Sequence, residues 1–397
     1  MKKLSILAAL FASVMFYSCN KTDGPSTSED VNFDDPSSVY LSDFSATDMP
    51  DYDTWVINDA EAETTDFAGL SEALASLYDS GREISLEFPK IDTIPAYAIY
   101  GDEYIHNYDF DKSVVVSVSA EIADGVGYAA FACCYNLRSI DLPAASTIDN
   151  SAFNFCSSLT TVSLPEAVTI GDAAFKLCAS LTTVNIPKAT SIGDNSFASC
   201  PVLSTLEADA VETIGEWAFV NCPSITAVEF PAVTSVGLGA FYSCANLATI
   251  DLPEVDNIGM WSFAYCPSLI NDIDMPKLTT IGSQAFYQCG SLAALSLPSA
   301  SLIGSGAFYS CSVLDTVDLP AASSIGSYAF RSCDALAALS LATDANSLLT
   351  IVDSDAFFDT DTSLISLTLG TANSPYISGN TLTIGSFSSE FGLITTL

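Results

Sequence analysis

The chain has 397 residues, and its 48 Asp and Glu against 11 Lys and Arg give a formal net charge of -37. This charge repels polyanions, so nucleic acid and anionic membranes are poor partners. Apolar residues make up 49% of the chain, too many for a disordered acidic tail, and the single histidine, His106, argues against enzymes that need imidazole as a base or metal ligand.

Residues 1–18 have the pattern of an export signal. A short basic head precedes an apolar run at 4–16. This run is too short to span a bilayer, which takes about 20 residues, but it has the length of a signal-peptide core. Ser18 and Cys19 resemble the end of a bacterial lipoprotein signal, although the two aromatic residues before Ser18 depart from the usual pattern. The resemblance implies cleavage before Cys19 and attachment of lipid to it; a plain secretory signal with an accidental cysteine is the alternative.

Residues 19–53 are rich in Ser, Asp and Pro, and they predict an acidic, flexible tether between the lipid and a folded body. In Bacteroides-like bacteria, acidic residues just after a lipidated cysteine accompany display on the outer surface. Lys21 with Asp23 loosely resembles that signal. We therefore expect a protein that is lipid-anchored in the outer membrane and displayed on the cell surface rather than in the periplasm.

Residues 54–113 are expected to form an N-terminal cap that includes a first, degenerate repeat at Leu86. A strand is predicted at 55–57 and an amphipathic helix at 66–80. The apolar residues that share one face of this helix are Phe67, Leu70, Leu74 and Leu77. Such a helix would shield the first coil of a stacked array.

Phenylalanine recurs every twenty-two residues through the middle of the chain, with one interval of twenty-three. These residues are Phe131, Phe153, Phe175, Phe197, Phe219, Phe241, Phe263, Phe286, Phe308 and Phe330. A cysteine follows each of them three residues later: Cys134, Cys156, Cys178, Cys200, Cys222, Cys244, Cys266, Cys289, Cys311 and Cys333. This regularity indicates a repeat protein in which each unit is one coil of a solenoid.

The unit at 159–178 shows what one coil requires, with the pattern L-x-x-V-x-L-P-x(5)-I-G-x-x-A-F-x-x-C. Val162 and Leu164 point to the same face of a short strand, and Pro165 ends that strand because it has no N–H for pairing. Gly171 marks a turn where a positive φ or a close backbone approach is expected. The phenylalanine fills the interior of the coil.

Weaker copies of the pattern extend the array over 114–369 in units of about 22 residues. With the degenerate repeat at Leu86, thirteen strands are expected, the last starting near Leu364. The tail at 370–397 is expected to cap the C-terminal end.

These units closely resemble the BspA-like class of bacterial leucine-rich repeats, found in surface proteins of Bacteroides, treponemes and some parasitic protists. The opening L-x-x-V-x-L is a leucine-rich-repeat strand signature, and I-G-x-x-A-F-x-x-C recurs with small departures such as Asp149 in the glycine slot. The resemblance implies an α/β repeat fold, a leucine-rich-repeat solenoid with a parallel concave sheet and an irregular or short helical convex side. It also implies surface adhesion or host-protein binding, and it brings no catalytic residues and no cofactor.

The cysteines of the repeats form a single column, which allows two interpretations. Buried reduced thiols would act as small apolar fillers with a weak S–H donor. In a disulfide ladder the Cα atoms would lie about 5 Å apart, but parallel stacking points the Cβ atoms the same way and makes the bridge geometry awkward. We expect reduced thiols, and no metal site, because each coil supplies one ligand at its level.

Outward strand positions carry the candidate partner-binding residues. Glu207, Glu229, Asp251 and Asp274 fall on four consecutive strands of the concave face. Carboxylates spaced about 5 Å apart repel one another, so this row either attracts a cationic partner or Ca²⁺, or keeps an exposed parallel sheet soluble and single. A second group lies between Phe and Cys on the convex side: Tyr242, Tyr265, Tyr287 and Tyr309.

An enzyme needs a nucleophile or an acid–base pair placed once, whereas these polar residues recur or are scattered, so we expect no catalysis. The preferred function is that of a monomeric cell-surface lipoprotein that binds a host or extracellular protein. A glycan-binding accessory role and a structural surface coat are the alternatives. Glycan binding would predict exposed pairs of tryptophan, and the chain has only Trp55, Trp217 and Trp261.

Overall fold

The computed structural model describes residues 82–99, 114–270 and 273–341. It also describes short pieces at 38–39, 54–57, 351–352 and 366–369 and the single residues Phe67, Leu70, Leu74, Leu77 and Ala356. The predicted signal at 1–18, the lipid site Cys19 and the tail at 370–397 lie outside the described residues, as does the tether at 19–53 apart from 38–39.

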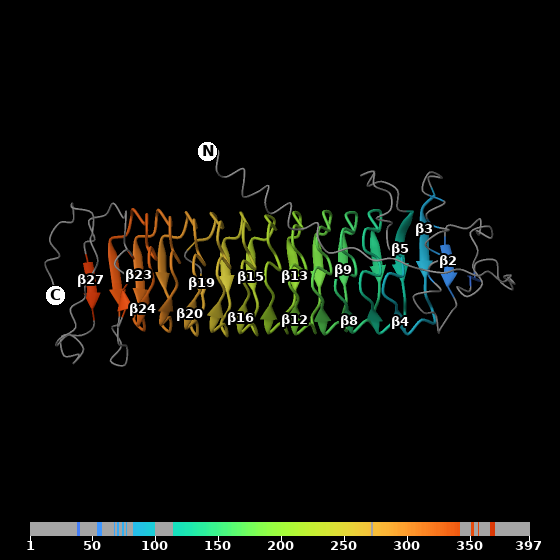
Figure 1. Cartoon of the computed structure of the whole chain (residues 1–397), viewed down its shortest axis with the longest axis horizontal. Coiled ribbons are helices and arrows are strands. Elements are labelled where there is room, and N and C mark those ends of the chain that lie inside the picture. Colours follow the sequence, from blue (N-terminus) through green and yellow to red (C-terminus); the bar gives the residue numbers. More distant parts are fainter. Residues whose placement is uncertain are drawn as a thin grey trace.

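The chain coils into an elongated solenoid with two rows of parallel strands along its length (Figure 1). The thirteen strands predicted from the repeats make up the first row. They are β3 (Ile84–Glu87), β5 (Val115–Ser119), β7 (Ser139–Asp141), β9 (Thr161–Ser163), β11 (Thr183–Asn185), β13 (Thr205–Glu207), β15 (Ala227–Glu229), β17 (Thr249–Asp251), β19 (Ile273–Asp274), β21 (Ala294–Ser296), β23 (Thr316–Leu319), β25 (Ala338–Leu341) and β27 (Ser366–Leu369).

The first row is divided into four sheets. At the N-terminal end β1 (Ser38–Val39) and β2 (Thr54–Ile57) join β3, β5 and β7, and the other sheets contain β9 to β13, β15 to β19 and β21 to β27. Successive strands pair one coil apart, so that Val184 of β11 lies beside Val162 of β9. Equivalent side chains of neighbouring coils are therefore adjacent.

The second row is one continuous sheet of twelve strands, each two residues long, in the order of the sequence. It contains β4 (Thr93–Ile94), β6 (Gly125–Val126), β8 (Thr147–Ile148), β10 (Thr169–Ile170), β12 (Ser191–Ile192), β14 (Thr213–Ile214), β16 (Ser235–Val236), β18 (Asn257–Ile258), β20 (Thr280–Ile281), β22 (Leu302–Ile303), β24 (Ser324–Ile325) and β26 (Ile351–Val352). The second residue of most of these strands is a buried Ile or Val.

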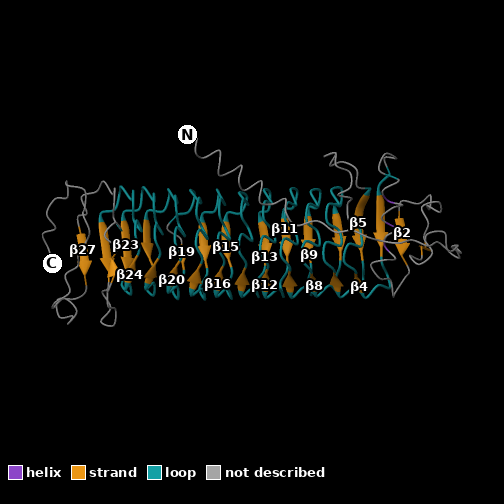
Figure 2. Cartoon of the chain, viewed as in Figure 1, coloured by secondary structure: helices purple, strands orange, loops and turns teal. Residues whose placement is uncertain are grey.

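Of the irregular or short helical convex side that was expected, the short helices are not confirmed and the structure is irregular. Between the second row and the next strand of the first row, the described coils of residues 114–341 contain turns and no helix (Figure 2). In the coil that begins at β9, Ala173 and Leu177 have φ of 54° and 62°, and these left-handed positions interrupt any helix. They recur in the other coils. The turns are joined instead to the next coil, as where the Phe153 N–H donates to the Ala174 carbonyl at 2.8 Å.

The interior of the solenoid is a column of stacked phenylalanines. The ten rings from Phe131 to Phe330 are fully buried, with neighbouring centroids 5.1 to 5.6 Å apart and planes within 12° of parallel. These separations describe offset stacking, the arrangement that the ring quadrupoles favour. Each coil therefore contributes one ring to a core that runs from end to end.

The cysteines form a second buried column beside the rings. Each of the ten repeat thiols donates to a carbonyl of the preceding coil at 3.1 to 3.4 Å, as Cys178 does to Phe153. Burial raises the pKa of the nine repeat thiols from Cys156 to Cys333, to about 12 for Cys222 and Cys311. None of the eleven cysteines of the described residues forms a disulfide, and each repeat cysteine is a small buried hydrogen-bond donor.

The repeat glycine allows neighbouring coils to approach closely. A Cβ on Gly171 would lie 2.6 Å from the backbone nitrogen of Asn150 in the preceding coil. The equivalent glycines of the later coils would each bring a Cβ within 2.7 Å of backbone atoms: Gly193, Gly215, Gly237, Gly259, Gly282, Gly304 and Gly326. Of the two reasons expected for Gly171, close approach is confirmed, because its φ is not left-handed.

At the N-terminal end, β2 extends the first sheet beyond β3 in parallel. The described residues Phe67, Leu70 and Leu74 are helical and buried, as the predicted apolar face requires. The Phe67 ring lies 5.8 Å from the ring of Phe88, which directly follows β3. These residues cover the first coil.

Candidate binding surfaces

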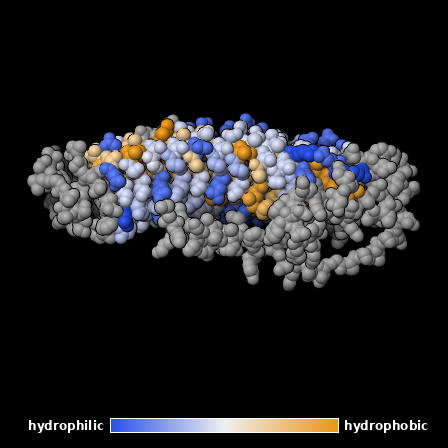
Figure 3. Space-filling model, turned by 90° about the horizontal axis from the view of Figure 1, so that it is seen from above, coloured by the Kyte–Doolittle hydropathy of each residue, from blue (hydrophilic) through white to orange (hydrophobic). Residues whose placement is uncertain are grey.

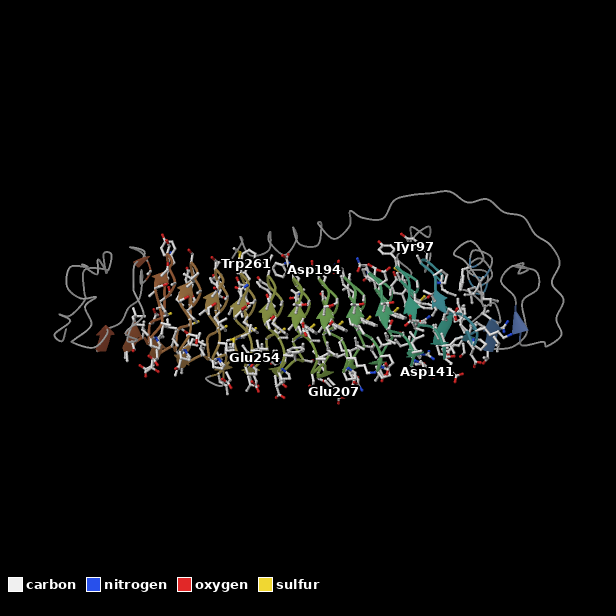
Figure 4. All side chains as sticks on the ribbon, turned by 90° about the horizontal axis from the view of Figure 1, so that it is seen from below. Tyr97, Asp141, Asp194, Glu207, Glu254 and Trp261 are labelled. Atoms are coloured by element: carbon white, nitrogen blue, oxygen red, sulfur yellow. The ribbon has the colours of Figure 1, made fainter. Side chains whose placement is uncertain are left out.

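The coils expose two faces of different chemistry. We call the outward positions of β7 to β25 the strand face, and the exposed residues between the repeat glycine and the repeat cysteine the turn face. In Figure 4, Asp141 and Glu207 of the strand face lie on one side of the solenoid, and Asp194 and Trp261 of the turn face lie on the opposite side.

The strand face carries the predicted row of carboxylates. Glu207, Glu229, Asp251 and Asp274 are all exposed. Glu229 pairs with Asp251, and Asp251 pairs with Asp274, so three of them lie in direct register across β15, β17 and β19. Glu207 is on β13, which belongs to the neighbouring sheet. Like charges in register repel one another, so the row adds no stability to the sheet.

The ion pairs of the described residues lie outside this row. Arg138 binds Glu83, Lys188 binds Glu166 at 2.6 Å, and Lys277 binds Glu254. In the part of the chain that the structure describes, no group of three or more ligating side chains is arranged to hold a metal ion. The four carboxylates of the row therefore do not converge on one point.

On the N-terminal half of the turn face, polar side chains accept hydrogen bonds from backbone N–H groups of the next coil. The Asn150 side-chain oxygen accepts the N–H of Asp172 at 2.8 Å, and the Asp172 carboxylate accepts the N–H of Asp194 at 2.9 Å. Asp194 in turn accepts the N–H of Glu216 at 2.7 Å. These side chains hold coils together, and their role is structural.

On the C-terminal half of the turn face, aromatic rings follow one another from coil to coil. We call this set the aromatic strip; it contains Trp217, Tyr242, Trp261, Tyr265, Tyr287 and Tyr309. Ring centroids lie 5.6 Å apart from Trp217 to Tyr242, then 5.1, 5.2 and 5.0 Å along the successive tyrosines, and each of these contacts is edge to face. The rings are half-buried.

The two tryptophans of the strip lie together. Their ring centroids are 6.0 Å apart, although a whole coil separates Trp217 from Trp261 in the stack. The intervening coil has Gly239 in the same slot, with φ of 60°, and a Cβ there would lie 2.3 Å from two indole carbons of Trp217. The missing side chain is what allows this indole to lie over the next coil. Trp261 is held by its Nε1–H, which donates to Gln284 Oε1 at 2.6 Å.

The sequence profile of the BspA type leucine rich repeat region matches the chain in 6 copies, over residues 84–204, 190–300 and 258–384. These ranges cover more than half of the chain. The chain belongs to this family. The buried Phe and Cys recur through the matched repeats, whereas the aromatic strip consists of positions that differ between the coils of this chain.

Several solved structures are similar to parts of the chain. The chain is 23% identical to a leucine rich cell surface protein of Faecalibacterium prausnitzii (TM-score 0.38). This match covers 68% of the present chain and 82% of the other protein. The chain is 21% identical to a leucine-rich repeat protein of Bacteroides ovatus (TM-score 0.41; 64% and 78% covered) and 15% identical to the pneumococcal vaccine antigen PcpA (TM-score 0.43; 83% and 91% covered). No curated protein sequence matches the chain.

Seen from above in Figure 3, the described repeats are mostly pale and blue, with orange atoms in small separate groups. Exposed aliphatic residues such as Val202 and Leu302 are single side chains, which are normal on a soluble surface. Within the described ranges, no helix is both long and apolar enough to cross a membrane.

Sequence reasoning named the strip's four tyrosines but missed its tryptophan pair. The signal was present, because Trp217 and Trp261 are forty-four residues apart, which is two repeats, and therefore share one slot. Only the small residue between them, Gly239, lets the two indoles meet. A search for tryptophans that are close in the sequence overlooks a contact between two tryptophans with a whole coil between them.

Proposed function

We propose that this BspA-type protein is a non-catalytic, monomeric cell-surface lipoprotein that binds a host or extracellular protein. The observation that carries the proposal is the parallel register of the coils. It sets equivalent exposed side chains side by side, as with Glu229, Asp251 and Asp274, while the buried Phe and Cys columns hold the coils rigidly in stack. A rigid surface with a repeated side-chain pattern suits binding to an extended partner.

The carboxylate row is the proposed contact surface for this protein partner. Glu207, Glu229, Asp251 and Asp274 are exposed and follow the long axis of the solenoid, so a basic segment lying along that axis would meet them in turn. Each contact would be exposed to water and screened by salt, so charge would contribute more to the rate and specificity of association than to affinity.

Cells that display the full chain would be tested for retention on immobilised extracellular-matrix proteins. The test variant changes the row to Glu207→Gln, Glu229→Gln, Asp251→Asn and Asp274→Asn. The control removes the same charge from exposed acids outside the row: Glu121→Gln, Asp209→Asn, Glu212→Gln and Asp334→Asn. We expect the test variant alone to lose retention, and wild-type retention to weaken towards about 0.5 M salt. Equal retention of both variants at low and high salt would leave the row with a role in solubility only.

Lipid attachment at Cys19 is proposed as the anchor, because it follows an apolar run of signal length and opens a polar tether. Cys19→Ser should move the protein from the membrane fraction to the soluble fraction. A variant that stays in the membrane fraction and is processed at the wild-type rate would contradict lipid anchoring without affecting the argument for the strand face.

A further inference from the structure

The rings of the aromatic strip are not required by the fold. In the slot directly after the repeat phenylalanine, which holds Tyr242, Tyr287 and Tyr309, other coils carry Ala132, Lys176 or Ala198. Those coils have the same strands, turns and stacked phenylalanines. Because coil stacking tolerates very different residues at this position, packing does not explain a run of half-buried aromatic rings.

The strip is long, narrow and continuous. Its edge-to-face contacts run through five successive coils from Trp217 to Tyr309, with one ring per coil along most of this length. A standard protein interface buries about 800 Å² on each partner, spread over a broad patch. A line of single rings fits a linear ligand better than a globular one.

The strip carries no charge of its own, on a chain whose formal net charge is -37. Between its glycine and its cysteine, each coil from Gly237 to Cys311 lacks Asp, Glu, Lys and Arg. Burial raises the pKa of Tyr242, Tyr265 and Tyr287 above the ordinary value, so these phenols stay neutral at physiological pH. Charge therefore lies only at the ends of the strip, where Glu216 precedes Trp217 and Arg331 lies over Tyr309, and the rings between them offer a ligand no charge.

Neutral hydrogen-bonding groups lie among the rings. The Gln284 side chain fixes Trp261, and the Gln288 Nε2–H donates to the Tyr287 hydroxyl at 3.3 Å. Asn221 is exposed in the same coil as Trp217. Ring faces with amides and hydroxyls between them match the two sides of a sugar ring, whose C–H groups pack on aromatic faces while its hydroxyls pair with amides.

The tryptophan pair is set before any ligand arrives. Gly239 gives the Trp217 indole its place over the next coil, and the hydrogen bond to Gln284 holds Trp261. Rings that are already held lose little conformational entropy on binding, which favours affinity. Beyond the other end of the strip, the Arg331 guanidinium lies over the Tyr309 and Tyr328 rings at 5.2 and 5.3 Å.

We propose that the aromatic strip binds a neutral, linear polysaccharide lying along the solenoid axis. This site is separate from the carboxylate row of the proposed function, because it lies on the opposite face. The protein would then hold a glycan on its turn face independently of any protein on its strand face.

The test is native affinity electrophoresis of the purified full-length chain through gels that contain a soluble neutral glucan, a mannan or a galactomannan, with anionic polygalacturonate for comparison. The strip variant is Trp217→Ala with Trp261→Ala. The matched control is Tyr97→Ala with Tyr128→Ala, an edge-to-face aromatic pair at 5.3 Å outside the strip. We expect a neutral polysaccharide to retard the wild type and the control, and the strip variant to bind at least about tenfold more weakly.

Two further variants keep the result interpretable if the double variant folds poorly. Gly239→Ala retains every ring but displaces the Trp217 indole, so it should also weaken binding, whereas Trp217→Phe should retain part of it. Binding should survive about 0.5 M salt and the neutralised carboxylate row. Retardation by polygalacturonate alone, by no polysaccharide, or equally for strip and control variants would overturn the proposal. So would a strip variant that loses only matrix-protein binding.

Discussion

The interior column and the outer faces of the solenoid follow opposite rules. Inside, the same side chain recurs in coil after coil, with phenylalanine rings 5.1 to 5.6 Å apart and a hydrogen-bonded thiol beside each ring. Outside, one slot holds Lys176 in one coil and Tyr242 or Arg331 in others. Stacking fixes the interior residues because each buried side chain must fit against its own copy one coil away. The outer side chains are not constrained in this way, so they can vary and take part in recognition.

Alkaline pH should affect the interior most strongly. An unfolded cysteine ionises near pH 8.5, whereas burial raises the pKa of Cys222 and Cys311 to about 12 and that of the other repeat thiols from Cys156 to Cys333 above its ordinary value. The folded state therefore keeps protons that the unfolded state loses. The stability that they provide is complete below about pH 8.5 and falls as pH rises, by about 1.4 kcal/mol per thiol and pH unit.

Chemical denaturation between about pH 7 and pH 10, under reducing conditions, measures this slope. Above about pH 9, the double variant Cys222→Ala with Cys311→Ala should show a slope smaller by about 2.8 kcal/mol per pH unit than the wild type, and near pH 7 the two slopes should agree. Two thiols that ionised freely in the folded state would leave the slope unchanged, and the buried column would then be wrong.

The close approach of the coils should be nearly as sensitive. Gly259→Ala would place a Cβ 2.7 Å from the backbone of Gly237 and Leu238, whereas Gly290→Ala meets no atom within 4 Å. We expect Gly259→Ala to lower the free energy of unfolding by about 1–3 kcal/mol through overpacking. Gly290→Ala is the control and should change it by less than about 0.5 kcal/mol. Equal effects of the two substitutions would contradict the contact between coils.

Ser262 is an exception inside the column and gives the smallest effect. It takes a slot that is alanine in most coils, and its hydroxyl is fully buried without a hydrogen-bond partner. Ser262→Ala should therefore raise the free energy of unfolding, by about 1 kcal/mol. Ser196→Ala, at the equivalent position, should do the same, and Ser305→Ala on the exposed turn should have no effect. A loss of stability on Ser262→Ala would reveal a partner for the hydroxyl.

The sequence predicts the interior well, because the buried residue types recur in it at a fixed interval. The thirteen strands of the first row, the buried phenylalanines and the close approach at Gly171 all follow from it. The second row does not, because strands of two residues such as β10 are too short to show any periodicity. The left-handed turns escape notice as well, since they use residues such as Ala173 and Leu177 rather than glycine.

The candidate surfaces are only partly predictable. Strand alternation places Glu229 and Asp251 outside, and the structure brings them into register. Strand alternation does not reveal that the sheet is divided between β13 and β15, which separates Glu207 from the other three carboxylates. The Trp217–Trp261 contact depends on the depth of the Gly239 slot, which is a property of the folded turn rather than of the repeat pattern.

Two residues adjacent in the sequence test the central claim most directly. Phe241 is fully buried in the column, and Tyr242 is half-buried on the turn face with edge-to-face contacts to Trp217 and Tyr265. The measurement is the free energy of unfolding of Phe241→Ala beside that of Tyr242→Ala. We expect a loss of about 3–5 kcal/mol for Phe241→Ala and of less than about 2 kcal/mol for Tyr242→Ala. Equal losses, or a larger loss for Tyr242→Ala, would contradict the division between an interior that holds the fold and faces that are free to bind.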